Sequence, residues 1–210
     1  MDIMKILRNK AKIEELDYLF IMNCLSFYKQ PRDKLTKLLK NNQLIRIKKG
    51  IYIFGEEYRY RPYSLEILAN LLYGPSYISF EYALSYYNLI PEKVTRITSA
   101  CSKRIKQFTT PVGDFVYYYL APLKYPVGIK IESIDENSNF LIATKEKALS
   151  DYLARIKLFN NKDDLFEYLI ESMRIDPTEL KNFNFSLMEE ISKIYKNKNI
   201  DLLCQIIKNH

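Results

Sequence analysis

The sequence predicts an α+β protein with two domains, and three observations lead to this expectation. Apolar residues recur at helical spacing in some segments and alternate with polar residues in others. Gly, Pro and Asn residues separate these segments, as they do in turns. A polar stretch at residues 56–62 divides a basic N-terminal part of the chain from a neutral remainder. We therefore expect one domain over residues 1–62 and a second over residues 63–210.

Composition limits the function classes. The chain has 210 residues, 48% of them hydrophobic and 27% charged, which is typical of a folded protein with a real core. Its three cysteines lie far apart without a C-x-x-C motif, so we predict neither a disulfide framework nor a zinc site. The single histidine is His210 at the C-terminus, which argues against histidine-based catalysis. We expect no enzyme, no metal and no cofactor.

The longest early apolar stretch, Leu19–Cys24, is too short to span a bilayer. No cleavage site of the A-x-A type follows a basic leader. We therefore expect a cytoplasmic protein that has no membrane partner.

The positive charge is concentrated in the first domain. The net charge is +7, and residues 1–62 hold 14 Lys and Arg against 7 Asp and Glu. Residues 63–210 hold 18 of each kind and are neutral. A segregated basic excess indicates a polyanionic partner, usually nucleic acid. The alternative is a solvated lysine-rich surface without a ligand.

The first domain begins with helical patterns. Residues 1–13 predict a basic helix, which either packs on the domain or contacts phosphates. Residues 14–28 carry apolar residues at helical spacing. Pro31 suits the first turn of the next helix, residues 32–41, where Leu35, Leu38 and Leu39 form the buried stripe. Lys34, Lys37 and Lys40 flank that stripe.

The segment LIRIKKGIYIF, residues 44–54, predicts a tight hairpin whose turn is Lys49-Gly50. The expected pairs are Lys48–Ile51, Ile47–Tyr52, Arg46–Ile53 and Ile45–Phe54. In this register Ile45, Ile47, Tyr52 and Phe54 share the buried face. Arg46 and Lys48 then project from the opposite face.

Helix, turn, basic helix and basic hairpin is the element order of a winged helix-turn-helix. Such a domain places its second helix in the major groove of DNA and its hairpin along the backbone or the minor groove. The predicted DNA contacts are Arg32, Lys34, Lys37, Lys40, Asn41, Arg46, Lys48 and Lys49. The alternative is a core motif of the same shape that binds nothing.

The sequence of the second domain predicts a mixed α/β fold with an antiparallel sheet and a helical tail. Ser64 and Ser79 are candidate N-caps of two helices, and Thr144 of a third. The expected strands are 94–100, 105–110, 115–121 and 140–143. From about residue 159 the chain is helical, over about 163–173, 177–182, 186–196 and 200–208.

Two segments of this domain resemble signature blocks of a known family. YISFEYALSYYNLIPE (Tyr77–Glu92) and IATKEKALSDYL (Ile142–Leu153) are similar to blocks of the AbiEi antitoxins, and RIKKGIYIF resembles the wing of that family. These proteins are the transcriptional regulators of bacterial abortive-infection toxin–antitoxin pairs. The resemblance covers about residues 16–158. Tyr82 and Asn88 stand where the family pattern has Ser and Gly.

The resemblance implies an antitoxin that also represses its own operon. Its winged helix would bind inverted repeats at its own promoter, and its second domain would counter a nucleotidyltransferase-like toxin, directly or only functionally. Glu146, Lys147 and Asp151 of the second block are the candidate antitoxin surface. The alternative is that Glu146 serves the helix N-terminus, while Lys147 and Asp151, at i and i+4, form an ordinary ion pair.

Three other functions remain open. One is a stand-alone winged-helix transcriptional regulator without a toxin, and another is a module whose basic part binds an acidic protein. The third is a metal-dependent nuclease built on Asp114, Glu132, Glu146, Asp151 and Lys147. The E-x-K spacing that such a site favours is absent because Glu146 and Lys147 are adjacent. Nor does the chain contain a Gly-Ser followed by a D-x-D pair, so it is not predicted to be the toxin.

Overall fold

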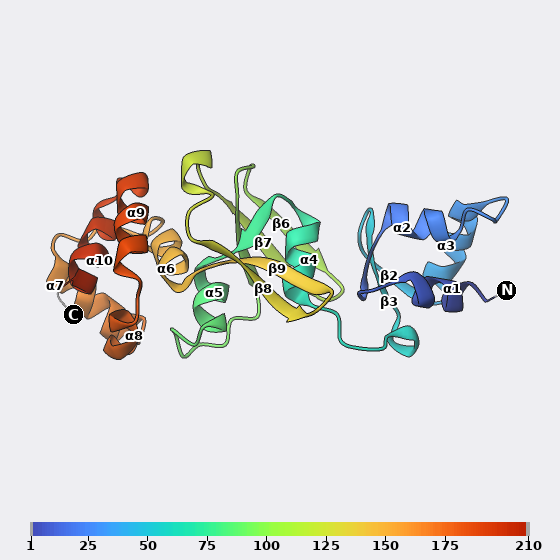
Figure 1. The fold of residues 1–210 in the computed structure, drawn as a ribbon, viewed down its shortest axis with the longest axis horizontal. Coiled ribbons are helices and arrows are strands. Elements are labelled where there is room, and N and C mark those ends of the chain that lie inside the picture. Colours follow the sequence, from blue (N-terminus) through green and yellow to red (C-terminus); the bar gives the residue numbers. More distant parts are fainter. Residues whose placement is uncertain (1, 209–210) are drawn as a thin grey trace.

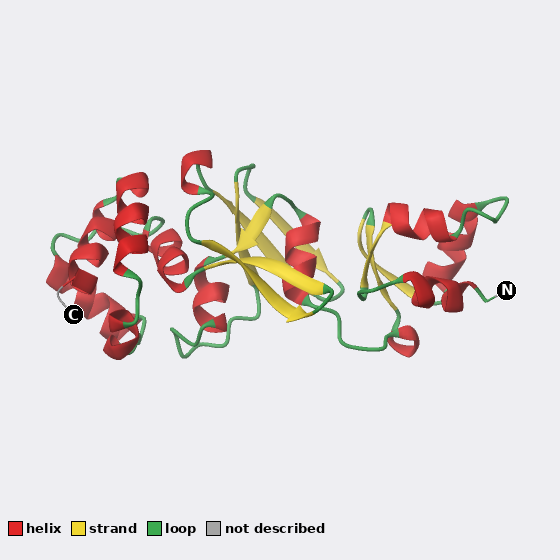
Figure 2. Ribbon diagram, in the orientation of Figure 1, coloured by secondary structure: helices red, strands yellow, loops and turns green. Residues whose placement is uncertain are grey.

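A computed structural model describes residues 2–208, so His210 lies outside the described residues. The molecule is elongated, with an N-terminal unit at one end, a sheet in the middle and a group of helices at the other end (Figure 1). The structure combines helices and strands, with β5 to β9 (residues 97–143) in succession and, up to residue 208, only helices after them, which confirms the predicted α+β class (Figure 2). Within residues 2–208, no helix is both long and apolar enough to cross a membrane.

The N-terminal unit combines three helices and a small sheet. Its elements are α1 (Ile3–Lys10), β1 (Glu15–Asp17), α2 (Tyr18–Cys24), α3 (Pro31–Lys40), β2 (Leu44–Lys48) and β3 (Ile51–Phe54). The three strands are antiparallel in the order β1-β3-β2. α1 packs on the unit through Ile3, Met4 and Leu7, which settles how the first residues are held.

The expected single helix over residues 14–28 is wrong at both ends. Glu15–Asp17 form a strand that pairs with β3, and α2 ends at Cys24. The carboxylate of Asp17 accepts a hydrogen bond from the Phe20 amide at 2.7 Å and so caps α2. A residue that favours a cap over a helix interior therefore divides the segment.

The predicted hairpin exists, but its register differs. Gly50 has φ +97°, as a tight turn requires, and Lys48 pairs with Ile51. A bulge at Ile47 then shifts the pairs to Arg46–Tyr52, Ile45–Ile53 and Leu44–Phe54. Because a bulge adds one residue to a strand, it places Arg46 and Lys48 on opposite faces, contrary to the prediction.

This sheet is buried on both faces. Leu44, Tyr52 and Phe54 pack with the helices of the N-terminal unit. Ile47 and Ile53 instead join the hydrophobic core of the second unit. The expected buried face of Ile45, Ile47, Tyr52 and Phe54 is therefore wrong.

The second unit is built on a six-stranded sheet. Its strands are β4 (Ser76–Ile78), β5 (Ile97–Cys101), β6 (Lys106–Thr110), β7 (Gly113–Tyr119), β8 (Ile129–Asp135) and β9 (Ser138–Ala143), in the order β6-β7-β5-β4-β9-β8. The sheet is mixed rather than antiparallel, because β5 pairs with β7 and β4 with β9 in parallel. β4 and β8 were not predicted. β4 has only three residues, too few for a periodic pattern, whereas β8 (IKIESID) begins with an alternation of Ile and charged residues that the prediction missed.

Helices surround this sheet and form the C-terminal end. α4 (Leu65–Leu72) and α5 (Phe80–Tyr86) precede β5, and α6 (Lys145–Leu153) follows β9. The remaining helices are α7 (Lys162–Glu167), the π-helical turn Tyr168–Ser172, α8 (Pro177–Lys181), α9 (Phe185–Tyr195) and α10 (Lys198–Lys208). Short 3-10 turns occur at Glu56–Tyr58 and Pro122–Lys124.

The predicted caps at Ser64 and Thr144 are confirmed. The Ser64 hydroxyl accepts a hydrogen bond from the Ile67 amide, and the Thr144 hydroxyl accepts one from the Lys147 amide. Ser79 occupies the N-cap position of α5, but its side chain makes no capping bond there.

Candidate functional site

α3 presents a row of cations at the N-terminal end of the molecule. Leu35 and Leu38 bury one side of this helix, so the flanking positions stay in water. Arg32, Lys37 and Lys40 are exposed, as is Asn41, which follows the helix. Lys34 is half-buried, and its ammonium lies 5.3 Å from the centre of the Tyr28 ring.

The hairpin supplies two further exposed cations, Arg46 and Lys49. Lys48 was predicted among them, but it faces the second unit. Its ammonium donates a hydrogen bond to the Leu72 carbonyl at 2.6 Å, at the end of α4, and lies 4.7 Å from the centre of the Phe108 ring. Lys48 is therefore engaged at the contact between the two units, because the bulge turns it to that face.

Two lysines of the second unit surround Lys48. Burial lowers the pKa of Lys48, and the charges of Lys106 and Lys103 lower it further. Lys103 donates a hydrogen bond to the Gly74 carbonyl, so Lys48 and Lys103 bind carbonyls at and just after the C-terminal end of α4. Cations at this end complement the helix dipole.

The predicted antitoxin surface is not a surface. The side chains of Lys147 and Asp151 are 0% exposed, and Glu146 is 7% exposed. The carboxylate of Glu146 accepts a hydrogen bond from the Asn184 amide at 2.8 Å, at the start of α9. The prediction of an exposed Glu146–Lys147–Asp151 face is therefore wrong, because helices from the end of the chain cover α6.

Lys147 and Asp151 instead form the centre of a buried polar network with Tyr77, Ser79 and Tyr195, here called the Lys147 network. Asp151 lies 3.4 Å from the Lys147 ammonium. It also accepts hydrogen bonds from Ser79 at 2.6 Å, from Tyr77 at 2.8 Å and from Tyr195.

Helix and strand periodicity brings these groups together. Lys147 and Asp151 are four residues apart on α6 and so share one face. Tyr77 and Ser79 are two residues apart and so point to the same side of the extended chain at β4. Tyr195, at the end of α9, had no sequence signal because it lies 44 residues after Asp151.

The charges of the Lys147 network are compensated. The Lys147 ammonium also donates to the Lys124 carbonyl and to the Tyr195 hydroxyl. Burial lowers the pKa of Lys147, while the neighbouring Asp151 charge opposes that shift. Burial and the Asp151 charge raise the pKa values of Tyr77 and Tyr195, so both phenols are neutral at physiological pH.

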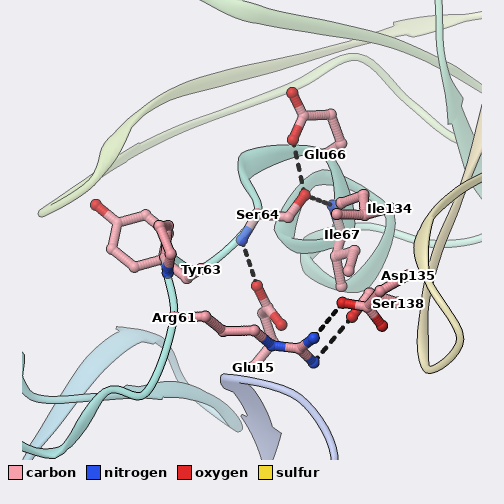
Figure 3. A pocket seen from close by; sticks show the side chains of 10 residues that line it. Glu15, Arg61, Tyr63, Ser64, Glu66, Ile67, Ile134, Asp135 and Ser138 are labelled. Carbon is pink, nitrogen blue, oxygen red and sulfur yellow. Dashed lines mark hydrogen bonds and ion pairs between the residues drawn. The ribbon is translucent and has the colours of Figure 1, made fainter.

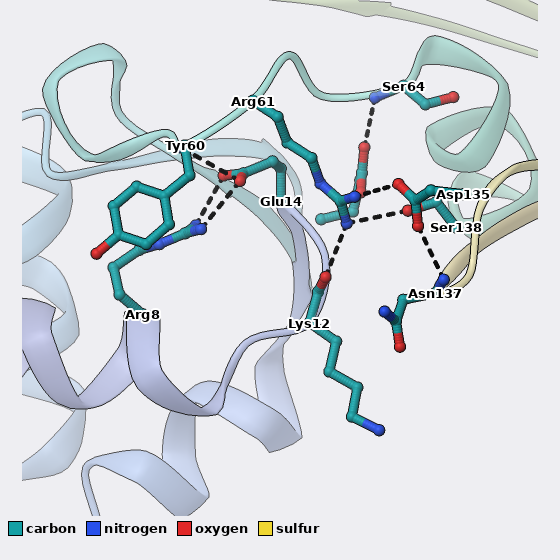
Figure 4. Close-up of polar contacts among 10 residues, drawn as sticks. Arg8, Lys12, Glu14, Tyr60, Arg61, Ser64, Asp135, Asn137 and Ser138 are labelled. Atoms are coloured by element: carbon teal, nitrogen blue, oxygen red, sulfur yellow. Dashed lines mark hydrogen bonds and ion pairs between the residues drawn. The ribbon is translucent and has the colours of Figure 1, made fainter.

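A second set of polar contacts joins the N-terminal unit to the sheet. Arg61 donates to the Lys12 carbonyl at 2.7 Å and to the Ser138 hydroxyl at 3.0 Å, and it forms an ion pair with Asp135 (Figure 4). Lys12 belongs to the N-terminal unit, whereas Asp135 and Ser138 flank the β8–β9 turn. Arg61 therefore links the two units directly.

Arg8 and Glu14 hold the connecting segment on the N-terminal side. The Arg8 guanidinium forms a bidentate pair with Glu14, and its centre lies 4.0 Å from the Tyr60 ring centre (Figure 4). It also lies 4.1 Å from the Phe54 ring centre. The expected connection at residues 56–62 is thus packed on its neighbours.

A pocket of about 370 Å³ lies between the units, beside Arg61 (Figure 3). Its charged groups are already engaged: Glu15 accepts from the Ser64 amide, and Glu66 accepts from the Ser64 hydroxyl at 2.7 Å. Burial raises the pKa of Glu15 above its usual value.

The four carboxylates of the alternative nuclease hypothesis do not form one cluster. Asp151 and Glu146 are buried in the contacts described above, and Glu132 pairs with Lys130 at 2.7 Å on β8. Asp114 belongs to β7. Over residues 2–208, no group of three or more Asp, Glu, His or Cys residues could hold a metal ion.

Comparison with known proteins does not identify a family for this chain. No protein-family model matches it, and no curated protein matches it. The resemblance to the AbiEi antitoxins therefore rests on the two quoted blocks and the hairpin segment alone.

Proposed function

We propose that the N-terminal unit is a winged helix that binds duplex DNA through α3. The order α1–β1–α2–α3–β2–β3 and the β1-β3-β2 sheet support this assignment. The observation that carries it is the row of exposed Arg32, Lys37 and Lys40 on α3, opposite the buried leucines. A helix of this kind meets phosphates on either side of the major groove.

The hairpin contributes less to the proposed interface than its sequence predicts. Arg46 and Lys49 are free to meet phosphate, whereas Lys48 is hydrogen-bonded within the protein. Lysine suits phosphate contacts more than base recognition, since it carries a compact charge on a flexible stem. Most of these cations would therefore supply affinity, and few would read bases.

The antitoxin role is proposed from the two resembling blocks. In this proposal the protein acts in the cytoplasm, represses its own operon at inverted repeats, and counters a nucleotidyltransferase-like toxin, directly or only functionally. Glu146, Lys147 and Asp151 are buried and so cannot contact a toxin. In this proposal they act within the second domain, as part of its interior. The second candidate is a stand-alone regulator without a toxin, which the exposed cations of α3 support equally.

The test of DNA binding is a gel-shift of the full chain against the DNA upstream of its own gene, across a salt series. We expect tighter binding to this DNA than to a scrambled duplex, and affinity that falls steeply as salt rises. Equal binding to both duplexes would remove the repressor assignment. No binding at low salt would remove the DNA proposal altogether.

The antitoxin role needs a separate test. The full chain, expressed from a foreign promoter, should restore growth to cells that produce the product of the adjacent gene. DNA binding without such rescue would favour the stand-alone regulator.

A further inference from the structure

A pocket of about 240 Å³ lies among α5, α6, the segment before β5 and the π-helical turn. It shares no residue with the basic surface of α3 or with the Lys147 network. Its apolar wall consists of Leu84, Ile90, Val94 and Met173. A volume of this size holds one short side chain or a small organic molecule, rather than a cofactor.

Glu81, a half-buried residue, contributes to this pocket a carboxylate with one unpaired oxygen. Its Oε2 atom is shielded from water and has no hydrogen-bond partner. Within residues 2–208, no ion pair includes Glu81. A shielded carboxylate oxygen without a donor is costly, so the site is suited to a ligand that donates a hydrogen bond.

Among the described residues, neither Arg155 nor Arg174 forms an ion pair with Glu81. The guanidinium of Arg155 lies 3.3 Å from the centre of the Tyr118 ring and 5.0 Å from that of Phe80. Arg174 pairs with Glu92, the second carboxylate residue of the pocket. The protein therefore leaves the Glu81 charge for another cation.

Two tyrosines complete the polar side. The hydroxyls of Tyr152 and Tyr168 lie 3.0 Å apart, and both residues line the pocket. Tyr168 opens the π-helical turn that ends at Ser172, and Arg174 just beyond it has φ +55°. Irregular helical turns and left-handed backbone at non-glycine residues often mark binding sites.

We propose that this pocket binds an organic cation on a short apolar stem, namely an alkylammonium or alkylguanidinium group. The cation would donate to Glu81, and its stem would pack on the apolar wall. A neutral ligand would leave the Glu81 carboxylate without a counter-charge, and an anion would be repelled by that carboxylate.

Two sources could supply this chemistry: a free small amine, or a Lys or Arg side chain presented by another protein. The inference does not depend on DNA binding, since the pocket and the basic surface belong to different units.

Methyl NMR of the full chain, labelled at the methionine methyl groups, tests the proposal. The chain has 5 methionines, and the Met173 signal can be assigned with Met173→Leu. n-Butylammonium should shift the Met173 signal saturably, whereas n-butanol, its uncharged counterpart, should not. No saturable shift with the amine, or the same shift with both probes, would overturn the proposal.

Two variants define the site. Glu81→Gln should weaken n-butylammonium binding by about tenfold or more, because a charge-assisted hydrogen bond is lost. Glu136→Gln, an exposed glutamate in the β8–β9 turn, should leave binding unchanged. Val94→Phe should block the pocket while keeping Glu81. Undiminished binding in both Glu81→Gln and Val94→Phe would overturn the assignment.

Blocked amino acids separate the two sources. If Nα-acetyl-lysine methylamide or its arginine counterpart binds at least as tightly as n-butylammonium, the pocket accepts a side chain of a partner protein. If the backbone amides prevent binding and only the free amine binds, the ligand is a small molecule. Either result supports a cation site.

Discussion

α3 and α6 are two helices that both contain lysines and leucines, but they lie in opposite environments. α3 (PRDKLTKLLK) buries only Leu35 and Leu38 and holds its cations in water. α6 (KEKALSDYL) buries residues around its whole circumference, including Lys147 and Asp151. α3 lies near one end of the molecule, whereas α6 lies between the sheet and the C-terminal helices (Figure 1). The comparison shows that a lysine in a helix predicts an exposed side chain only where one face of that helix is not covered by other elements.

The largest effect is expected in α6. Asp151→Ala would leave the Lys147 ammonium without its counter-charge and would remove the acceptor of three hydroxyl groups. Breaking a buried ion pair from one side typically costs about 3–5 kcal/mol of stability. Urea unfolding should show this loss, and Asp163→Ala, at an exposed residue, should change stability by about 1 kcal/mol or less.

The double variant Lys147→Met/Asp151→Leu separates charge from packing. Since both ions are removed together, it should be more stable than Asp151→Ala alone. A double variant as unstable as the single variant would mean that the hydroxyl groups of the Lys147 network, rather than the ion pair, dominate its stability.

Much of the fold follows from local patterns. The N-caps Ser64 and Thr144, the turn at Gly50 and the apolar periodicity of α3 each depend on a few neighbouring residues, and each was predicted. Register and parallel pairing depend on distant segments. The bulge at Ile47 and the parallel pairing of β5 with β7 therefore had no local signal.

The candidate sites show the same contrast between features set by neighbouring residues and features set by distant segments. Exposure of Arg32, Lys37 and Lys40 follows from the leucine stripe of their own helix. Burial of Lys147 depends on Tyr195, which only the tertiary fold brings near. The i, i+4 pairing of Lys147 with Asp151 was foreseen, but its burial was not, because charged side chains are rarely fully buried.

The second prediction concerns α3. If Lys37 and Lys40 each meet a phosphate, Lys37→Ala/Lys40→Ala should lower the slope of log affinity against log salt by about 1.8. At 0.1 M salt this corresponds to roughly 60-fold weaker DNA binding. Stability should change by less than about 0.5 kcal/mol, because both side chains are exposed.

Lys193→Ala/Lys208→Ala is the matched control, since it removes two exposed lysines from the opposite end of the chain. Its salt slope should equal that of the wild type. Equal slopes for both double variants would identify the α3 lysines as a solvated surface.

A smaller effect is expected where the two units meet. Arg61→Ala removes the contacts with Lys12, Asp135 and Ser138. Because these side chains are partly exposed, stability should fall by about 1 kcal/mol or less. Small-angle scattering should show at most a small increase in the radius of gyration, because Lys48, Ile47 and Ile53 still hold the two units together. Arg59→Ala, whose native guanidinium lies 5.2 Å from the centre of the Tyr63 ring, should leave the scattering unchanged.

The smallest effect concerns a second buried carboxylate. Glu15 is 5% exposed, and its carboxylate accepts a hydrogen bond from the Ser64 amide. Unlike Asp151, it forms no ion pair with any residue that the structure describes. Burial raises its pKa above the usual 4.5, so the folded protein holds this proton at a pH where the unfolded chain has released it. The stability that Glu15 contributes is therefore fully present below pH 4.5 and declines as pH rises through its folded pKa.

Glu15→Gln isolates this contribution, because the amide oxygen can still accept from Ser64 and has no proton to lose. The free energy of unfolding of the wild type minus that of Glu15→Gln should decline as pH rises from 4.5 and become constant above the folded pKa. The same difference for Glu56→Gln, at an exposed residue, should show no such decline. A rising difference for Glu15 would mean that Arg61, whose charge lowers this pKa, outweighs burial. Glu15 would then resemble Asp151, as a carboxylate held in the interior by a cation.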